Sequence, residues 1–324
     1  MKKTVKTALY ALAAAALAFG LFCAFSHIVY GRSAAATAVE LYLRVATRGR
    51  MMTEEETLEL MRERAEAEDG PLELPRLKYA SAVEDTELFG CRMMVFSGSD
   101  APERTVIYMH GGAYVNEITR YHLRFCDTLA QRVNARVIAP IYPLAPNHGY
   151  AETYEIIDAL YDAELSRGLP IIMMGDSAGG GFAAAFCEKL VREGRPLPQS
   201  EVLLSPWVDV SMSGSDYAAY RDTDPMVGLE RIRTMGKSWA RELDTKDPLI
   251  SPLYGSAEGL PKTLVFLGTR ELLYPDIISF CDKLEAAGVP VQLEIKRGMN
   301  HVYPVYPIPE AKEAMDIIEE FVLE

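Results

Sequence analysis

The sequence predicts an α/β fold in which a mostly parallel sheet is flanked by helices within one large domain. Two observations carry this prediction. Residues 105–300 alternate short apolar runs, typical of buried strands, with longer stretches of helical periodicity, and such alternation indicates a parallel sheet covered by helices. Hydrophobic residues make up 49% of the 324-residue chain, which is enough to bury both faces of the sheet.

The expected strands of the parallel part are short apolar runs. They span residues 105–110, 135–141, 170–174, 201–205, 263–268 and 291–296. Residues 81–96 are expected to add antiparallel strands at one edge. A helix is expected over about residues 277–287, because Gly288 follows it and glycine readily adopts the left-handed conformation that ends a helix.

The most informative motif follows the expected strand at 170–174. Residues 175–179 read Gly-Asp-Ser-Ala-Gly and precede a helix-like stretch at 182–186. This is the pattern of a nucleophile elbow, in which a serine occupies a sharp strand-to-helix turn and the glycines remove side chains that would clash there. We therefore expect Ser177 to be a catalytic nucleophile. The alternative is a glycine-rich turn without chemistry.

A serine nucleophile needs a base to take its proton. The chain has five histidines: His27, His110, His122, His148 and His301. In this architecture the triad runs in the chain order serine, acid, histidine, and His301 is the only histidine after Ser177. It lies in a loop after the expected strand at 291–296, so we expect His301 to be the base.

Two carboxylates follow the expected strand at 263–268. Glu271 is the closer to the strand end, and the 30 positions between it and His301 leave room for one helix and one strand. We therefore expect Glu271 to be the acid that orients the imidazole. Asp276 is the alternative, and its other interpretation is the N-cap of the next helix. A more distant acid such as Asp247 also stays open.

The negative charge that develops on a substrate oxygen needs hydrogen-bond donors. Residues 110–114 read His-Gly-Gly-Ala-Tyr and follow the first expected parallel strand. Successive glycines let backbone amides approach an oxygen closely. We expect the amides of Gly111 and Gly112, together with that of Ala178, to form an oxyanion hole. His110 is expected to brace the loop.

Six short motifs, taken together, carry a resemblance to a known family. They are HGGAY at 110–114, YPLAP at 142–146, GDSAGG at 175–180, SPW at 205–207, DPLISPLYG at 247–255 and GMNH at 298–301. Over roughly residues 75–324, the chain resembles the hormone-sensitive-lipase-like branch of the α/β-hydrolases, the fold-3 esterases. The resemblance implies an α/β-hydrolase fold with an eight-stranded, mostly parallel sheet and a helical cap. It also implies a serine hydrolase that cleaves carboxylic esters through an acyl-enzyme intermediate, with no metal or other cofactor.

The motifs depart from the commonest pattern of this family at three positions. Ala113 replaces the third glycine of the loop at 110–114, Pro143 stands where the family often has arginine, and Glu271 stands where it usually has aspartate. Glutamate is chemically adequate as a triad acid. The resemblance also implies that part of the cap is an insertion at about residues 208–245 of the catalytic domain.

The first 36 residues differ in composition from the rest of the chain. Three lysines precede an apolar run from Ala8 to Phe25, which is long enough for a transmembrane helix and longer than the usual core of a signal peptide. Lysines before the helix place the N-terminus in the cytoplasm and the hydrolase outside it. We expect an uncleaved membrane anchor in residues 1–36. The alternative is a secreted enzyme, released by cleavage near residues 34–36.

A charged helix is expected between the anchor and the hydrolase. Thr53 and Glu56 have capping-box spacing, and Gly70-Pro71 would end the helix. We assign residues 37–74 to a linker and this N-terminal cap helix, and residues 75–324 to the catalytic domain.

The charge balance limits the partners. The chain has 33 Lys and Arg against 46 Asp and Glu, and residues 1–36 hold four of the basic residues and none of the acidic ones. Such an acidic domain is not expected to bind nucleic acid. Contact with the lipid bilayer is expected through the N-terminal helix, and the other expected partner is a small-molecule ester. The five cysteines show no metal-ligand spacing.

Two other functions stay open beside ester hydrolysis. The same triad could remove acetyl groups or cleave amides. A non-catalytic receptor for small molecules could also use this fold, because fold does not determine function. The presence of Ser177, an acid and His301 argues against the receptor.

Overall fold

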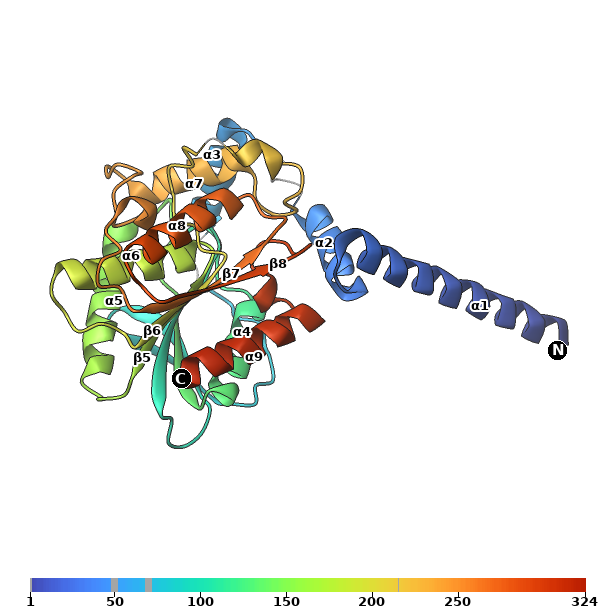
Figure 1. The fold of residues 1–324 in the computed structure, drawn as a ribbon, viewed down its shortest axis with the longest axis horizontal. Helices are drawn as coiled ribbons and strands as arrows, with labels where there is room; N and C mark the ends of the chain where they lie inside the picture. The colour runs from blue at the N-terminus through green and yellow to red at the C-terminus, as the bar shows by residue number, and fades with distance from the viewer. Residues whose placement is uncertain (1, 48–51, 68–71, 215) are drawn as a thin grey trace.

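The computed structural model confirms an α/β-hydrolase fold built on one eight-stranded sheet (Figure 1). It describes residues 2–47, 52–67, 72–214 and 216–324. The strands are β1 (Ala82–Leu88), β2 (Cys91–Ser97), β3 (Arg104–Met109), β4 (Ala135–Pro140), β5 (Ile171–Asp176), β6 (Ser200–Leu204), β7 (Lys262–Gly268) and β8 (Val291–Lys296). Their order across the sheet is β1-β2-β4-β3-β5-β6-β7-β8. β2 is antiparallel to both β1 and β4, and the other neighbouring strands are parallel, as the sequence predicts.

Helices and short helical turns connect the strands. The helices are α1 (Lys2–Phe25), α2 (Ala34–Ala46), α3 (Glu54–Ala67), α4 (Arg120–Arg132), α5 (Tyr150–Leu165), α6 (Ala178–Arg192), α7 (Leu229–Ala240), α8 (Tyr274–Ala286) and α9 (Pro309–Leu323). A π-helical turn, η1, spans Ser26–Tyr30, and 3-10 turns span Asp216–Ala219 (η3), Pro252–Tyr254 (η4) and Tyr303–Val305 (η5). α8 begins earlier than the predicted residue 277, because Pro275 is tolerated in a first helical turn.

The two faces of the sheet are buried under different helices. Successive residues of a strand point to opposite faces. Met173 of β5 therefore packs in the core shared with α5, α6 and α8, whereas Met174 packs in the core shared with α4 and α9 (Figure 1). Both residues are fully buried, which is the pattern of a sheet covered on both faces.

The N-terminal segment contains an apolar helix that projects away from the hydrolase (Figure 1). The helical segment Tyr10–Tyr30 is long and apolar enough to cross a membrane. A signal sequence near the N-terminus can have the same length and composition. α2 follows directly, so residue 36, where we place the end of the anchor, lies inside this helix. Ser33 caps α2 by accepting a hydrogen bond from the Ala36 amide at 3.0 Å.

Helices α3 and α7 pack against each other above the sheet (Figure 1). The predicted capping box of α3 is confirmed: Glu56 accepts from the Thr53 amide at 2.8 Å, and Thr53 Oγ1 accepts from the Glu56 amide at 3.2 Å. The predicted end of this helix, Gly70-Pro71, lies outside the described residues.

Candidate active site

Ser177 occupies the sharp turn between β5 and α6. Its φ angle is +52°, a left-handed conformation that is costly for a residue with a side chain. The two glycines of the motif make the turn possible. A Cβ on Gly175 would lie 2.4 Å from the Gly179 oxygen, and a Cβ on Gly179 would lie 2.0 Å from the Met109 oxygen. The surrounding backbone therefore holds the serine in this strained position.

His301 links Ser177 to Glu271 through a chain of hydrogen bonds. The Nε2 atom of His301 lies 2.8 Å from Ser177 Oγ, and its Nδ1 atom lies 2.7 Å from Glu271 Oε2. Glu271 is fully buried, and His301 is nearly so. A neutral imidazole with its proton on Nδ1 can donate to the carboxylate while Nε2 accepts the serine proton. The structure thus brings together the three residues that the sequence selects.

Further hydrogen bonds fix the Glu271 carboxylate. Its Oε1 atom accepts from the Gly268 amide at 2.5 Å and from Ser205 Oγ at 3.0 Å. The Ser205 hydroxyl accepts in turn from the Val302 amide at 3.1 Å, beside His301. Motif spacing alone gave no indication of this contact of Ser205, which opens the SPW motif at 205–207.

The two alternative acids lie elsewhere. The Asp276 carboxylate accepts a hydrogen bond from the Tyr217 hydroxyl at 2.7 Å, in the first turn of α8. Its interpretation as an N-cap is wrong, because Leu273 occupies the cap position. Asp247 accepts from the Leu249 amide at 2.9 Å and so closes a local turn.

The surroundings of His301 favour its charged form. Burial by itself would lower the pKa of His301, but the hydrogen bond and charge of Glu271 outweigh burial and raise that pKa above 6.5, with Asp224 and Asp176 adding to the effect. Such a shift stabilises the imidazolium that forms when the histidine takes a proton.

The loop at 110–114 departs from the predicted oxyanion hole in one respect. The Gly111 amide already donates to Asp176 Oδ1 at 2.9 Å, so it is not free to bind a substrate oxygen, and this part of the prediction is wrong. Within the described parts of the chain, no hydrogen bond has the amide of Gly112, Ala113 or Ala178 as its donor. Gly112 and Ala113 both line the cavity above Ser177.

The carboxylate of Asp176, the residue before Ser177, contacts three groups below the cavity: the Tyr108 hydroxyl, the Gly111 amide and the His122 ring. Burial would raise the pKa of Asp176, but the charge of His122 and the hydrogen bonds from Tyr108 and Gly111 hold it below its usual range. His122 Nε2 lies 3.5 Å from Asp176 Oδ2. Sequence order excluded His122 as the base, and it gave no indication of this contact.

His110 braces the loop at 110–114, as we expected. It is fully buried, and its ring stacks on that of Tyr142 with centroids 4.4 Å apart. Burial and the charge of His122 lower the pKa of His110 to about 4, so its ring is neutral at physiological pH.

A mostly apolar cavity of about 380 Å³ opens above Ser177 and His301. Its walls come from the loop at 110–114, from the segment around α7 and from α2, which lies largely within the region 37–74 that we assign to the linker and N-terminal cap. The residues contributed by α2 and the turn after it are Tyr42, Leu43, Ala46 and Thr47, and those from the predicted cap insertion include Met226, Val227, Ile232 and Met235. The helix that follows the apolar N-terminal segment is therefore part of the cavity wall.

Comparisons with known proteins agree with the α/β-hydrolase fold. A family profile described as alpha/beta hydrolase fold matches residues 106–305. The chain is 30% identical to an esterase of Acinetobacter venetianus over 245 residues, which are 74% of this chain and 81% of that protein. It is also 30% identical to an acetyl-hydrolase of Streptomyces hygroscopicus over 223 residues, which are 67% and 75% of the two chains.

Solved structures of esterases also match this chain. An esterase from the bacterial hormone-sensitive lipase family matches with a TM-score of 0.72 and 30% identity, covering 83% of this chain and 96% of that one. An esterase/lipase from an uncultured bacterium matches with a TM-score of 0.75 and 26% identity, covering 89% and 97% of the two chains.

Proposed function

The chain belongs to the α/β-hydrolase family as a carboxylesterase- or lipase-like hydrolase of the hormone-sensitive-lipase type, and on that basis we propose that Ser177, His301 and Glu271 are its catalytic triad. The observation that carries the proposal is the hydrogen-bonded chain from Ser177 Oγ through His301 to Glu271, with its distances of 2.8 and 2.7 Å.

In the proposed first half-reaction, His301 Nε2 takes the hydroxyl proton while Ser177 Oγ attacks the ester carbonyl carbon. The amides of Gly112, Ala113 and Ala178 stabilise the negative charge on the carbonyl oxygen. When the bond to the alcohol breaks, His301 gives its proton to the leaving alkoxide oxygen, and the acyl group stays on the serine.

In the second half-reaction, a water molecule replaces the alcohol. His301 takes a proton from the water as its oxygen attacks the acyl-enzyme carbonyl, and then returns that proton to Ser177 Oγ as the carboxylic acid leaves. Throughout the cycle, the Glu271 carboxylate orients the imidazole and stabilises its charged form.

The proposed substrate is a carboxylic ester whose acyl or alcohol part is apolar, because apolar side chains form much of the cavity wall. Removal of acetyl groups is the second candidate, and the similarity to the Streptomyces acetyl-hydrolase favours it. Both reactions would use the same triad.

One experiment tests the triad and separates the two substrate classes. Purified protein is assayed on p-nitrophenyl esters of increasing chain length and, in parallel, on acetylated sugars. Ser177→Ala should lower kcat by about 10⁴- to 10⁶-fold, and a serine-directed organophosphonate should label Ser177 alone. Unchanged ester turnover by the folded variant would refute the proposed nucleophile.

We further propose that the apolar helix is retained as a membrane anchor, with residues 75–324 as an extracytoplasmic catalytic domain. The length of the segment Tyr10–Tyr30 supports this. N-terminal sequencing of the membrane and culture-supernatant fractions tests it. Membrane-bound protein that retains the first lysines and is digested by protease added to intact cells is expected. A soluble chain that begins after residues 34–36 would contradict the proposal.

A further inference from the structure

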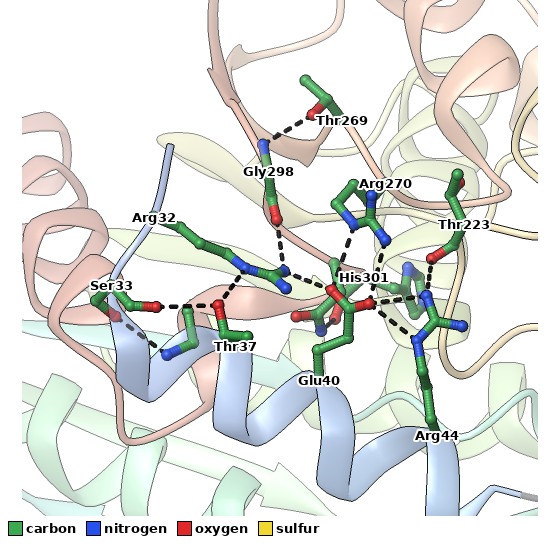
Figure 2. Close-up of polar contacts among 12 residues, drawn as sticks. Arg32, Ser33, Thr37, Glu40, Arg44, Thr223, Thr269, Arg270, Gly298 and His301 are labelled. Atoms are coloured by element: carbon green, nitrogen blue, oxygen red, sulfur yellow. Dashed lines mark hydrogen bonds and ion pairs between the residues drawn. The ribbon is translucent and has the colours of Figure 1, made fainter. Parts of the chain in front are cut away.

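Glu40 is a buried carboxylate on α2 that three arginines share (Figure 2). Arg32 approaches it to 2.5 Å, Arg44 to 2.7 Å and Arg270 to 3.1 Å. Glu40 and Arg32 are each only 4% exposed, so water screens their interaction little. Burial by itself would raise the pKa of Glu40, but the hydrogen bonds from Arg270 and Arg44 and the charge of Arg32 lower it below its usual value. The carboxylate is therefore ionised at neutral pH.

Two of these arginines lead directly to the proposed triad. Arg32 Nη1 donates to the backbone oxygen of Gly298 at 2.7 Å, and Gly298 lies in the loop that leads to His301 (Figure 2). Arg270 is the residue immediately before Glu271. The Glu40 carboxylate therefore joins the two loops that carry the acid and the base.

The third arginine, Arg44 of α2, connects Glu40 to the cap segment that contacts the loop of Glu271. Arg44 Nη2 donates to the backbone oxygen of Thr223 at 2.9 Å. The next residue, Asp224, is fully buried and accepts from the Leu272 amide at 2.7 Å. Since Leu272 follows Glu271 in the chain, the segment that carries the acid is held on both sides.

We propose that Glu40 is a positioning residue for the reaction, one that aligns Glu271 with His301 through its three arginines. This inference rests on the proposed function of those two residues. Reaction rate depends steeply on alignment, since a displacement of about 1 Å can cost on the order of 100-fold. Loss of the Glu40 charge should therefore lower kcat much more than it changes KM.

The same contacts make the N-terminal segment part of the catalytic architecture. Arg32 lies between the apolar helix and α2, next to Ser33, which donates a hydrogen bond to Glu310 at 2.9 Å. Cleavage near residues 34–36 would remove both Arg32 and the helix cap. It would leave Glu40 with two of its three arginines, so a released enzyme should turn over substrate more slowly than the intact chain.

The test is Glu40→Gln in the full-length protein, solubilised in detergent. Complete labelling with a serine-directed organophosphonate counts the folded active sites, and kcat is expressed per labelled site. We expect kcat per site to fall about 10- to 100-fold, with KM within about twofold of the wild type. The acidic limb of the pH–rate profile should also move to lower pH, because a weakened contact with Glu271 raises the pKa of His301 less.

Glu164 supplies a matched control. It is another buried glutamate, 2% exposed, that binds Arg167 at 3.0 Å and Arg136 at 3.7 Å. It lies near the end of α5, at the edge of the sheet opposite Ser177. Glu164→Gln should reduce the number of labelled sites through lower stability, but kcat per labelled site and the pH profile should stay unchanged.

A milder variant covers the case in which Glu40→Gln fails to fold. Arg32→Lys keeps the charge but loses the planar group that reaches both Glu40 and Gly298, and kcat per site should fall by a smaller factor. Wild-type kcat per site in the folded variants would overturn the positioning role. If Ser177→Ala still turned over esters, the proposed function would fail instead, so the two failures are distinguishable.

Discussion

The two edges of the parallel sheet carry similar buried ion pairs with different consequences. At the carboxyl edge, Glu40 ties together loops that hold Glu271 and His301. At the amino edge, Glu164 accepts a hydrogen bond from Thr105, at the start of β3, at 3.0 Å. Its partners hold α5 to the beginnings of strands, where no residue of the proposed triad lies.

The difference follows from the direction of the strands. In a parallel sheet, the loops after neighbouring strands meet at the carboxyl edge. Ser177 follows β5, Glu271 follows β7 and His301 follows β8, so these three side chains converge. A buried charge at that edge can orient reacting groups, whereas the same chemistry at the amino edge can affect only stability. Four predictions test this contrast.

The largest expected effect comes from Glu271→Gln. The amide keeps the shape of the side chain but loses the charge that orients and stabilises the His301 imidazolium, so kcat should fall by about 10³- to 10⁴-fold. Steady-state kinetics on a short p-nitrophenyl ester measure this loss. Asp276→Asn is the control and should retain nearly full kcat. A larger loss in the folded control would mean that Asp276 is the acid.

The second prediction concerns pH. His301 must be neutral to accept a proton, and its pKa is raised above 6.5, so kcat/KM should fall as pH decreases through a value above 6.5. The charged form contributes stability that is fully present below about pH 6.5 and is lost as pH rises through the raised pKa. Activity and this part of the stability should thus change in opposite directions. An acidic limb below 6.5 would contradict the prediction.

At the amino edge, Glu164→Gln should lower the free energy of unfolding by about 1–3 kcal/mol and leave kcat unchanged. Arg167 and Arg136 lose their charged acceptor there, but no loop of the proposed triad moves. Denaturant melts followed by fluorescence, together with kcat per labelled site, measure the two quantities. A fall in kcat per site would show that the two edges are coupled.

The smallest effect on activity is expected from Asp276→Asn, which should change only how stability depends on pH. Burial raises the pKa of Asp276 to about 7. The charge of Asp209 also raises this pKa, and the hydrogen bond from Tyr217 lowers it in part. The wild type should therefore lose stability as pH rises from about 4 to 7, because the unfolded chain releases this proton first. The asparagine variant should lack that loss. Parallel stability curves for the two proteins across this range would refute the assignment.

The sequence alone predicted the sheet and two members of the hydrogen-bonded chain, Ser177 and His301. The alternation of apolar runs with helical stretches reports burial residue by residue, and all six predicted parallel strands are present. Ser177 was found because its turn needs glycines at fixed neighbouring positions. His301 was found because one histidine satisfied the order of the triad.

Other features could be decided only by the folded chain. The engagement of the Gly111 amide by Asp176 joins residues from two different strand ends, and the choice of Glu271 over Asp276 depends on where each side chain points after β7. Glu40 meets Arg270 across 230 positions of the chain. Periodicity and motif spacing describe what neighbours in the sequence can do, whereas the partner of a buried charge is set by which loops the sheet brings to the same edge.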